Sequence, residues 1–250
     1  MSFENINLPD DFSILHFDEL DSTNLKAKEI AENESFCDKM IILADKQLAG
    51  RGRYDRKWLS CDGNLYFSLI LKDDCLDSKT SSQISFIAAL AAGKSVADFA
   101  ENITLKWPND ILISDKKTGG ILIEAVGQSN KFDAMIVGIG INIKNYPKNV
   151  IFPATSISEN SDKISNRNIL LEKIIKNFDN YYNIWKNNGF SEIREQWHKM
   201  SFEIGKKISS KTHNETLEGI YKGISKNGEL LLELDNNEIR SITAGDVFFG

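Results

Sequence analysis

The pattern of hydrophobic and polar positions predicts a mixed region of strands and helices up to about residue 203. Apolar runs rich in β-branched and aromatic residues predict strands, and apolar residues at helical spacing predict helices. The predicted strands cover residues 12–17, 40–44, 64–71, 103–106, 110–113, 120–126 and 132–143. One predicted helix begins after Ser22, a residue type favoured at helix N-caps, and two more cover 82–100 and 166–200.

The last helical segment places its large apolar residues on one face. Five of them recur at intervals of three or four positions, namely Leu170, Ile174, Phe178, Tyr181 and Trp185. Because this interval is the repeat of one helix face, the residues are expected to pack into a hydrophobic core rather than to form a cofactor site.

From about residue 204 the pattern changes to short strand-like runs, which cover 206–210, 215–224, 229–234 and 238–242. Asn227-Gly228 and the Asp-Asn-Asn run 235–237 separate them, and such residues favour hairpin turns. A short module of this kind predicts a small β-barrel or sandwich. The chain is therefore expected to have an α+β fold in two domains, 1–203 and 204–250.

Composition narrows the class of protein. The 250 residues include 30 Lys and Arg and 36 Asp and Glu, and the net charge of −6 disfavours non-specific nucleic-acid binding. The three cysteines lack CxxC spacing and the N-terminus lacks signal-peptide features, so a reduced, cytoplasmic setting is expected. The longest apolar run, 86–93, is far shorter than the roughly 20 residues of a membrane-spanning helix. His16, His198 and His213 stand apart in the sequence and suggest neither a zinc site nor a Ser-His-Asp triad.

The run Gly50–Trp58, GRGRYDRKW, is the first candidate for chemistry. Glycines leave backbone N–H groups open to close approach by an anion, and arginines bind phosphate or carboxylate through paired hydrogen bonds. Trp58 offers a flat surface for adenine or another ring. Taken alone, the run is equally consistent with a mobile solvated loop or a nucleic-acid contact.

Two further motifs place polar residues beside predicted strands. In Lys106–Asp110, KWPND, the residue before proline is held out of the helical region, and the turn points Asn109 and Asp110 in one direction. Taken alone, this motif is also that of an ordinary β-turn. In Lys116–Glu124, KKTGGILIE, two glycines enter a buried strand, which marks either close approach by a ligand or a β-bulge.

The runs Gly138–Ile143, GIGINI, and Asp21–Asn24, DSTN, are weaker signals when taken singly. GIGINI lacks the third glycine and the following helix of a dinucleotide-binding fingerprint, so a buried strand that ends at Asn142 fits better. DSTN by itself indicates a helix N-cap.

In their order along the chain these motifs resemble those of class I biotin–protein ligases. The resemblance runs from DSTN through Gln47 and AGRGR to KWPND, KKTGGILIE and GIGINI, and it covers most of residues 12–143. It implies a class II aminoacyl-tRNA-synthetase-like catalytic domain, with a mixed sheet and flanking helices, followed by a C-terminal SH3-like β-barrel.

The resemblance also implies a reaction. Biotin carboxylate would attack the α-phosphorus of ATP to give biotinyl-5′-AMP and pyrophosphate, and a lysine of a carboxylase's biotin carboxyl carrier domain would then take the biotinyl group. Mg²⁺ is expected with the ATP phosphates, with no protein ligand directly assigned. Arg51 and Lys117 match the catalytic cations, and Asp110 the Mg²⁺ environment or the orientation of the incoming amine. Replacing Arg51 or Lys117 by alanine is expected to slow adenylation by more than about tenfold.

Two sets of binding residues carry over from the same motifs. The ureido ring of biotin has one acceptor and two donors, which suit hydroxyl and amide side chains. Biotin is expected to contact Ser22, Thr23, Asn24, Gln47, Gly50, Arg51, Gly52, Arg53, Lys117 and Gly120. ATP is expected to contact Arg53, Arg56, Trp58, Lys106, Asn109 and Asn142.

Three further expectations concern a residue that differs from the family, the lack of a DNA-binding domain, and the oligomeric state. Asp55 stands where many members have glycine, so Asp55→Gly is expected to change the leakage of biotinyl-AMP from the enzyme. The ligase core begins by about residue 12, so no DNA-binding repressor domain, and no operator binding in a gel-shift assay, is expected. The strand around 132–143 is a candidate sheet edge for pairing two copies, so the protein is expected to be a monomer or a homodimer.

Two alternatives stay open. A lipoate or octanoate ligase on a related fold has a different motif set, and competition between biotin and lipoate for adenylate formation would distinguish it. A non-catalytic module that binds biotin or nucleic acid is opposed by the complete motif set and by the net charge. Pyrophosphate release on adding biotin and ATP would separate an enzyme from such a module.

Overall fold

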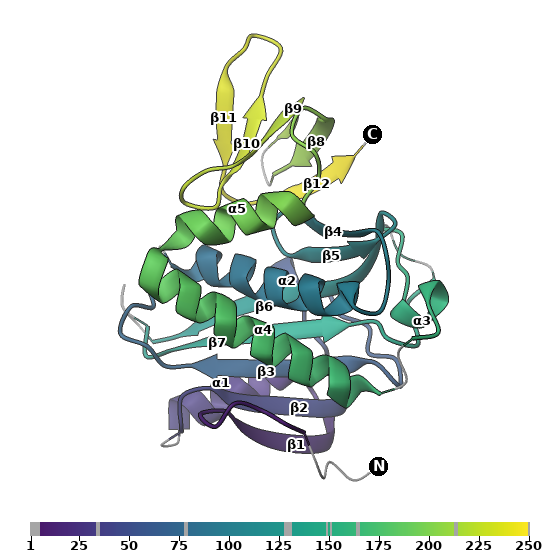
Figure 1. Cartoon of the computed structure of the whole chain (residues 1–250), viewed down its shortest axis with the longest axis vertical. Coiled ribbons are helices and arrows are strands. Elements are labelled where there is room, and N and C mark those ends of the chain that lie inside the picture. The colour runs from purple at the N-terminus through teal and green to yellow at the C-terminus, as the bar shows by residue number, and fades with distance from the viewer. Residues whose placement is uncertain are drawn as a thin grey trace.

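Two β-sheets form the framework of the molecule, with the smaller sheet at the C-terminal end (Figure 1). The structure is a computed structural model, and it describes residues 6–33, 36–77, 80–127, 132–148, 150, 152–163, 166–212 and 215–249. Within these residues no helix is long and apolar enough to cross a membrane.

The larger sheet is mixed, as the sequence predicts. Its strands lie in the order β1-β2-β3-β7-β6-β5-β4, and only the β1–β2 pair is parallel. The strands are β1 (Ser13–Leu20), β2 (Met40–Gln47), β3 (Leu65–Leu71), β4 (Ile103–Lys106), β5 (Asp110–Ile113), β6 (Lys116–Val126) and β7 (Ala134–Ile141). All seven strand predictions are confirmed, with shifts of a few residues at the ends.

The expectation that the strand around 132–143 is a sheet edge is wrong. β7 is hydrogen-bonded to β3 on one side and to β6 on the other, and the edges of the sheet are β1 and β4. Almost every residue of β7 is buried, which is the pattern of an interior strand. Pairing of two copies through this strand is therefore excluded.

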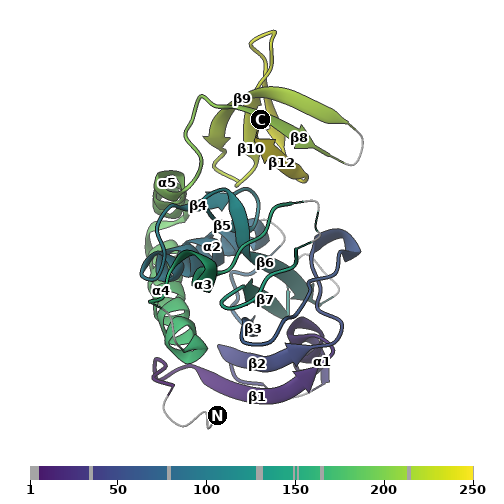
Figure 2. The ribbon, with the colours of Figure 1, turned by 90° about the vertical axis from the view of Figure 1, so that its right-hand side faces the viewer.

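Helices cover both faces of the larger sheet. α2 (Ser81–Ala97) lies against one face, with α4 (Arg167–Asn188) and α5 (Phe190–Met200) outside it, and α1 (Thr23–Asn33) lies against the other (Figures 1 and 2). α2 is apolar nearly all round because it is enclosed by the sheet and the outer helices. A one-turn helix, α3 (Ile157–Asn160), was not predicted.

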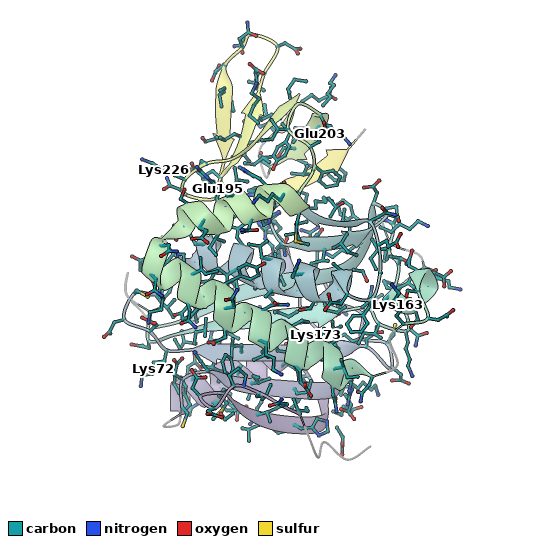
Figure 3. The ribbon with its side chains drawn as sticks, viewed as in Figure 1. Lys72, Lys163, Lys173, Glu195, Glu203 and Lys226 are labelled. Atoms are coloured by element: carbon teal, nitrogen blue, oxygen red, sulfur yellow. The ribbon has the colours of Figure 1, made fainter. Side chains whose placement is uncertain are left out.

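The predicted helical region 166–200 contains two helices rather than one. Gly189 ends α4 with a φ of 77°, a left-handed value that favours glycine, and α5 starts at the next residue. The apolar stripe is confirmed as core, since Leu170, Ile174 and Phe178 are almost fully buried. Charged residues such as Lys173 on α4 and Glu195 on α5 lie on the outer side of these helices (Figure 3).

The C-terminal sheet is antiparallel, in the order β11-β10-β9-β8-β12. Its strands are β8 (Lys207–Lys211), β9 (Thr216–Ile224), β10 (Leu230–Glu233), β11 (Ile239–Ile242) and β12 (Asp246–Phe249). The first four were predicted. β12 was missed because its four residues carry no alternation long enough to stand out, and its place is fixed by pairing with β8.

A buried contact joins the two sheets near the KWPND motif. The peptide bond between Trp107 and Pro108 is cis, and the Trp107 indole N–H donates to the carbonyl of Gly228 at 3.0 Å. Gly228 has a φ of 83°, and a Cβ there would lie 2.6 Å from the Phe86 ring. The turn between β9 and β10 therefore packs closely against α2.

One carboxylate ties the loop after β3 to α4. Asp73 accepts hydrogen bonds from the Tyr182 hydroxyl at 3.0 Å and from the Lys186 ammonium at 2.6 Å, and the Cys75 thiol lies 2.9 Å away. Burial opposes ionisation of Asp73, but these hydrogen bonds outweigh it and hold the pKa well below its ordinary value of 3.8.

Asp73→Asn is expected to lower the free energy of unfolding by about 1–3 kcal/mol at pH 7, the scale of hydrogen bonds to a charged group. Since the folded-state pKa is depressed, the stabilisation is present above the unfolded pKa and is lost as the pH falls through the folded value. Urea unfolding should therefore show the difference shrinking below about pH 4. Asp162→Asn, at an exposed carboxylate, is the control, and an equal loss there would contradict the assignment.

Candidate active site

Strands β6 and β7 expose bare backbone on the α1 side of the sheet. Successive side chains of a strand point to opposite faces, so the odd-numbered residues of 135–141 pack in the core with α2, while Ile136 packs with α1. Gly138 and Gly140 continue the α1 face, and Gly120 of β6 pairs with Gly140. These three glycines form what we call the glycine floor.

A cavity of about 460 Å³ lies over the glycine floor. The structure describes all the residues that were predicted to form the site. Of these residues, only Gly50 and Lys106 lie outside the lining of the cavity. The motifs, which are far apart in the sequence, thus converge on one cavity. The predicted residues in the lining are Ser22, Thr23, Asn24, Gln47, Arg51, Gly52, Arg53, Arg56, Trp58, Asn109, Asp110, Lys117, Gly120 and Asn142.

The loop Gly50–Trp58 forms one wall of the cavity. Two backbone hydrogen bonds close it, from the Trp58 N–H to the Gly50 carbonyl at 2.8 Å and from the Gly52 N–H to the Arg56 carbonyl at 2.7 Å. A Cβ at Gly50 would lie 2.5 Å from the Trp58 carbonyl oxygen, so this position requires glycine. Gly50 therefore shapes the base of the loop from outside the cavity.

The same loop is bonded to the C-terminal sheet. Arg56 pairs with the Asp246 carboxylate at 2.9 Å, and the Arg53 guanidinium donates to the Gly245 carbonyl at 3.4 Å. Asp246 also lines the cavity, so the C-terminal sheet completes its wall. The side chain of Asp55 lies outside the described residues, and the expectation about it stays a prediction.

The Trp58 indole lies on the glycine floor. A Cβ at Gly140 would be 2.8 Å from the indole, and one at Gly120 would be 3.0 Å from it. The Trp58 Nε1 atom is buried and has no hydrogen-bond partner in the described part of the chain. The absence of side chains at both glycines is what lets an aromatic ring approach the sheet so closely.

Two lysines lie near Asp110 in different surroundings. Lys117 is in the cavity lining, and its ammonium forms an ion pair with Asp110 and lies 5.5 Å from the centroid of the Trp58 ring. Lys106 is buried, with its ammonium 4.4 Å from the centroid of the Phe152 ring. Burial lowers the pKa of Lys106, although the carboxylate of Asp110 acts in the opposite direction.

Two asparagines offer acceptors to the cavity. The Asn142 amide N–H donates to the Thr155 carbonyl at 3.1 Å, and its buried Oδ1 atom has no partner among the described residues. Asn109 donates to the Ile121 carbonyl at 2.6 Å, which likewise turns its amide nitrogen toward the protein. A buried acceptor without a donor is costly unless a ligand supplies the missing hydrogen bond.

The start of α1 forms a buried polar cluster at the opposite end of the glycine floor. The backbone N–H of Thr23 donates to Gln47 Oε1 at 2.9 Å, and the Thr23 hydroxyl lies 3.2 Å from the same oxygen. The Ser68 hydroxyl donates to Asn24 Oδ1 at 2.6 Å and lies 2.8 Å from the Thr23 hydroxyl. The DSTN run therefore begins a helix and also places polar groups in the cavity.

Sequence reasoning missed several residues of the site. Asp246 lines the cavity, and Ser68 donates a hydrogen bond to Asn24 of the lining. Their segments looked like the end of the chain and an ordinary strand. Glu124 was inside a motif, and its carboxylate binds Arg51 at 2.8 Å. The alternation along β6 puts Glu124 on the same face as Gly120, and this signal could have found it.

One group of potential metal ligands lies away from the cavity. His16, Asp18 and Asp45 hold ligand atoms within 4.8 Å of one another, so His16 is not isolated in space. Asp45 Oδ1 already receives hydrogen bonds from His16 and Arg167, each at 2.5 Å. Burial opposes ionisation of Asp45, but these bonds hold its pKa below the ordinary value. The group is therefore an ion-pair cluster.

Comparison with known proteins agrees with this geometry. The sequence profile of the Biotin/lipoate A/B protein ligase family matches residues 17–142. The chain belongs to this family. The profile of the Biotin protein ligase C terminal domain matches residues 204–250. The two matches together identify the protein as a biotin protein ligase.

Relatives of the ligase span nearly all of its length. The bifunctional ligase/repressor BirA of Bacillus subtilis is 36% identical over 95% of this chain and 74% of the relative. The biotin–[acetyl-CoA-carboxylase] ligase of Paracoccus denitrificans is 31% identical over 92% of this chain and 98% of the relative. The structure of the Aquifex aeolicus biotin protein ligase in complex with biotin and ATP superposes with a TM-score of 0.82, at 27% identity, and covers 95% of this chain and 99% of that one.

Proposed function

We propose that the ligase joins biotin to a carrier lysine in two steps inside this cavity. In the first, a biotin carboxylate oxygen bonds to the α-phosphorus of ATP, and the bond to the β-phosphate oxygen breaks to release pyrophosphate. In the second, the carrier amine attacks the biotinyl carbonyl, loses a proton, and AMP leaves. The acceptor is proposed to be the biotin carboxyl carrier domain of a carboxylase, in line with the Paracoccus relative, which is a biotin–[acetyl-CoA-carboxylase] ligase.

The convergence of cations on one cavity is the observation that carries this proposal. Arg51, Arg53, Arg56 and Lys117 all line it, beside the Trp58 indole that lies on the glycine floor. Two anions must meet in the first step, so fixed positive charges both reduce their repulsion and stabilise the charge that develops on the phosphate oxygens. We assign Arg51 and Lys117 to this role, with Asp110 holding Lys117 in place.

The two ends of the cavity suit the two substrates. The hydroxyl and amide groups of Thr23, Asn24 and Gln47 match the donors and acceptor of the ureido ring. At the other end the unpaired Oδ1 of Asn142 is an acceptor for the exocyclic amine of adenine. Biotin and ATP are therefore assigned to opposite ends, in line with the Aquifex ligase that holds both.

Mg²⁺ fits the cavity as a companion of ATP. It prefers carboxylate oxygens and phosphates, and Asp110 and Asp246 are carboxylates in the lining. When bound, the ion supplies neutralisation of phosphate charge. Lys117 pairs with the Asp110 carboxylate and Arg56 with that of Asp246.

Pyrophosphate release tests the proposal. Purified protein given biotin and Mg·ATP should release pyrophosphate, and labelled biotin should then appear on a purified carrier domain. Lipoate supplied in place of biotin is the matched comparison, because the alternative is a lipoate or octanoate ligase. Faster adenylation of lipoate than of biotin would overturn the assignment.

Other expectations stay as proposals. The larger sheet is proposed to belong to a class II aminoacyl-tRNA-synthetase-like domain, and the smaller sheet to an SH3-like barrel. The division into domains 1–203 and 204–250 and a cytoplasmic location are proposals as well. The absence of operator binding also stays a prediction, since relatives such as BirA of Bacillus subtilis are ligase/repressors, and a gel-shift assay tests it. The monomeric or homodimeric state is open to sedimentation measurements.

A further inference from the structure

Glu124 joins two parts of the site that belong to different elements. Its Oε1 atom accepts a hydrogen bond from the Arg51 guanidinium at 2.8 Å, and its Oε2 atom accepts one from the Asn24 amide at 2.8 Å. The Arg51 side chain is 36% exposed to solvent, and the Glu124 side chain is 22% exposed. One partly buried carboxylate of β6 therefore holds the loop Gly50–Trp58 to the start of α1.

The contact with Asn24 extends into the buried polar cluster. Because a carboxylate can only accept, Asn24 must turn its NH₂ group toward Glu124 and its carbonyl oxygen toward Ser68. Ser68 has one O–H, which goes to Asn24, so at 2.8 Å it accepts from the Thr23 hydroxyl, and the Thr23 backbone N–H donates to Gln47 Oε1. A continuous chain of hydrogen bonds thus runs from Gln47 to Arg51, and the charge of Glu124 sets its direction.

The backbone leaves room for this arrangement. A Cβ at Gly138 would lie 2.1 Å from Asn24 Oδ1, and all three of the nearest atoms belong to Asn24. Gly138 pairs with Ser68 on one side and with Leu122 on the other, so it lies between the strands that supply the partners of Asn24. The glycine and the carboxylate together fix the position of one amide.

We propose that Glu124 is a positioning residue for biotin binding, which acts by holding Arg51 at the cavity and by orienting Asn24. This inference rests on the proposed function, in which Arg51 is a cation where the biotin carboxylate meets ATP, and the α1 cluster meets the ureido ring. Arg51 has five N–H donors, so pairing with Glu124 leaves others for the ligand. A single carboxylate thereby aligns the residues assigned to both polar ends of biotin.

The test is a double-mutant cycle of Glu124→Gln and Arg51→Ala, with the biotin dissociation constant measured by calorimetry. Glutamine keeps an acceptor for Asn24 but removes the charge that holds Arg51. Glu124→Gln is expected to weaken biotin binding by about fivefold in the wild-type background, the scale of one partly screened ion pair. In the Arg51→Ala background the same substitution should change the dissociation constant less than about twofold.

Glu233→Gln is the matched control, because Glu233 pairs with Lys222 at 2.9 Å in the C-terminal sheet, with a similar exposure of 28%. It should leave biotin binding unchanged. Glu124→Asp, which keeps the charge, should bind biotin better than Glu124→Gln, and it also serves if the glutamine variant does not fold. An equal loss with and without Arg51, or no loss at all, would overturn the inference. Wild-type pyrophosphate release reports separately on the proposed function, since binding is measured without turnover.

Discussion

Lys117→Ala is expected to slow formation of biotinyl-AMP by about 10²-fold, the effect of removing one preorganised group that stabilises transition-state charge. The Lys117 ammonium is in the lining of the cavity and is held there by Asp110. Its backbone is fixed as well, since its N–H donates to the Pro153 carbonyl and its carbonyl accepts from the Thr155 N–H. Pyrophosphate release at saturating biotin and Mg·ATP measures the rate.

Lys116→Ala is the matched control for this experiment. Lys116 is the preceding residue on the same strand, has the same charge and is exposed to solvent. It should adenylate biotin at the wild-type rate, which separates the loss of a positioned cation from the loss of net charge. A wild-type rate for Lys117→Ala, or an equal loss in both variants, would remove Lys117 from the catalytic role.

Gly138→Ala is expected to weaken biotin binding by at least about fivefold, since overpacking a dense site costs about 1–3 kcal/mol. The added methyl group would occupy the position of the Asn24 amide, with its carbon 2.1 Å from Oδ1. Asn24 is almost fully buried and cannot move aside without losing its bonds to Ser68 and Glu124. Biotin titration by calorimetry measures the loss.

The control removes the atoms that collide. In an Asn24→Ala background the space above residue 138 is open, so Gly138→Ala should lower the free energy of urea unfolding much less there than in the wild-type chain. Equal destabilisation by Gly138→Ala with and without the Asn24 side chain would mean that the strand itself, rather than the amide, rejects the methyl group.

Much of the framework could be predicted because its signals are local. The run 40–44 and the run 64–71, which is apolar except for Asn64 and Ser68, are β2 and β3, and the enclosed helix over 82–100 is α2. The motif residues were predicted to share a site, and the sheet brings them to one cavity, although their individual roles stay predictions. Gly120 was expected to support biotin, whereas the Trp58 indole lies on it in this structure.

What could not be predicted depends on contacts between distant segments. The place of β7 inside the sheet follows from pairing with β3 and β6, which no window of its own sequence reveals. The bond between Arg56 and Asp246 joins residues 190 positions apart. Lys106 lies outside the cavity lining, with its ammonium against the Phe152 ring. Phe152 in turn stacks on Phe248 of the C-terminal sheet.

The glycine floor has a consequence for inhibitor design. The Trp58 indole and the Asn24 amide cover its glycines, so an inhibitor meets the floor through these two side chains, whose close approach depends on the bare backbone beneath them. Any single substitution at Gly138 or Gly140 would add a carbon within 2.8 Å of Asn24 or Trp58. A compound that draws its affinity from Trp58 and Asn24 would therefore meet few substitutions of the glycine floor that lower its binding without also damaging the site of the enzyme.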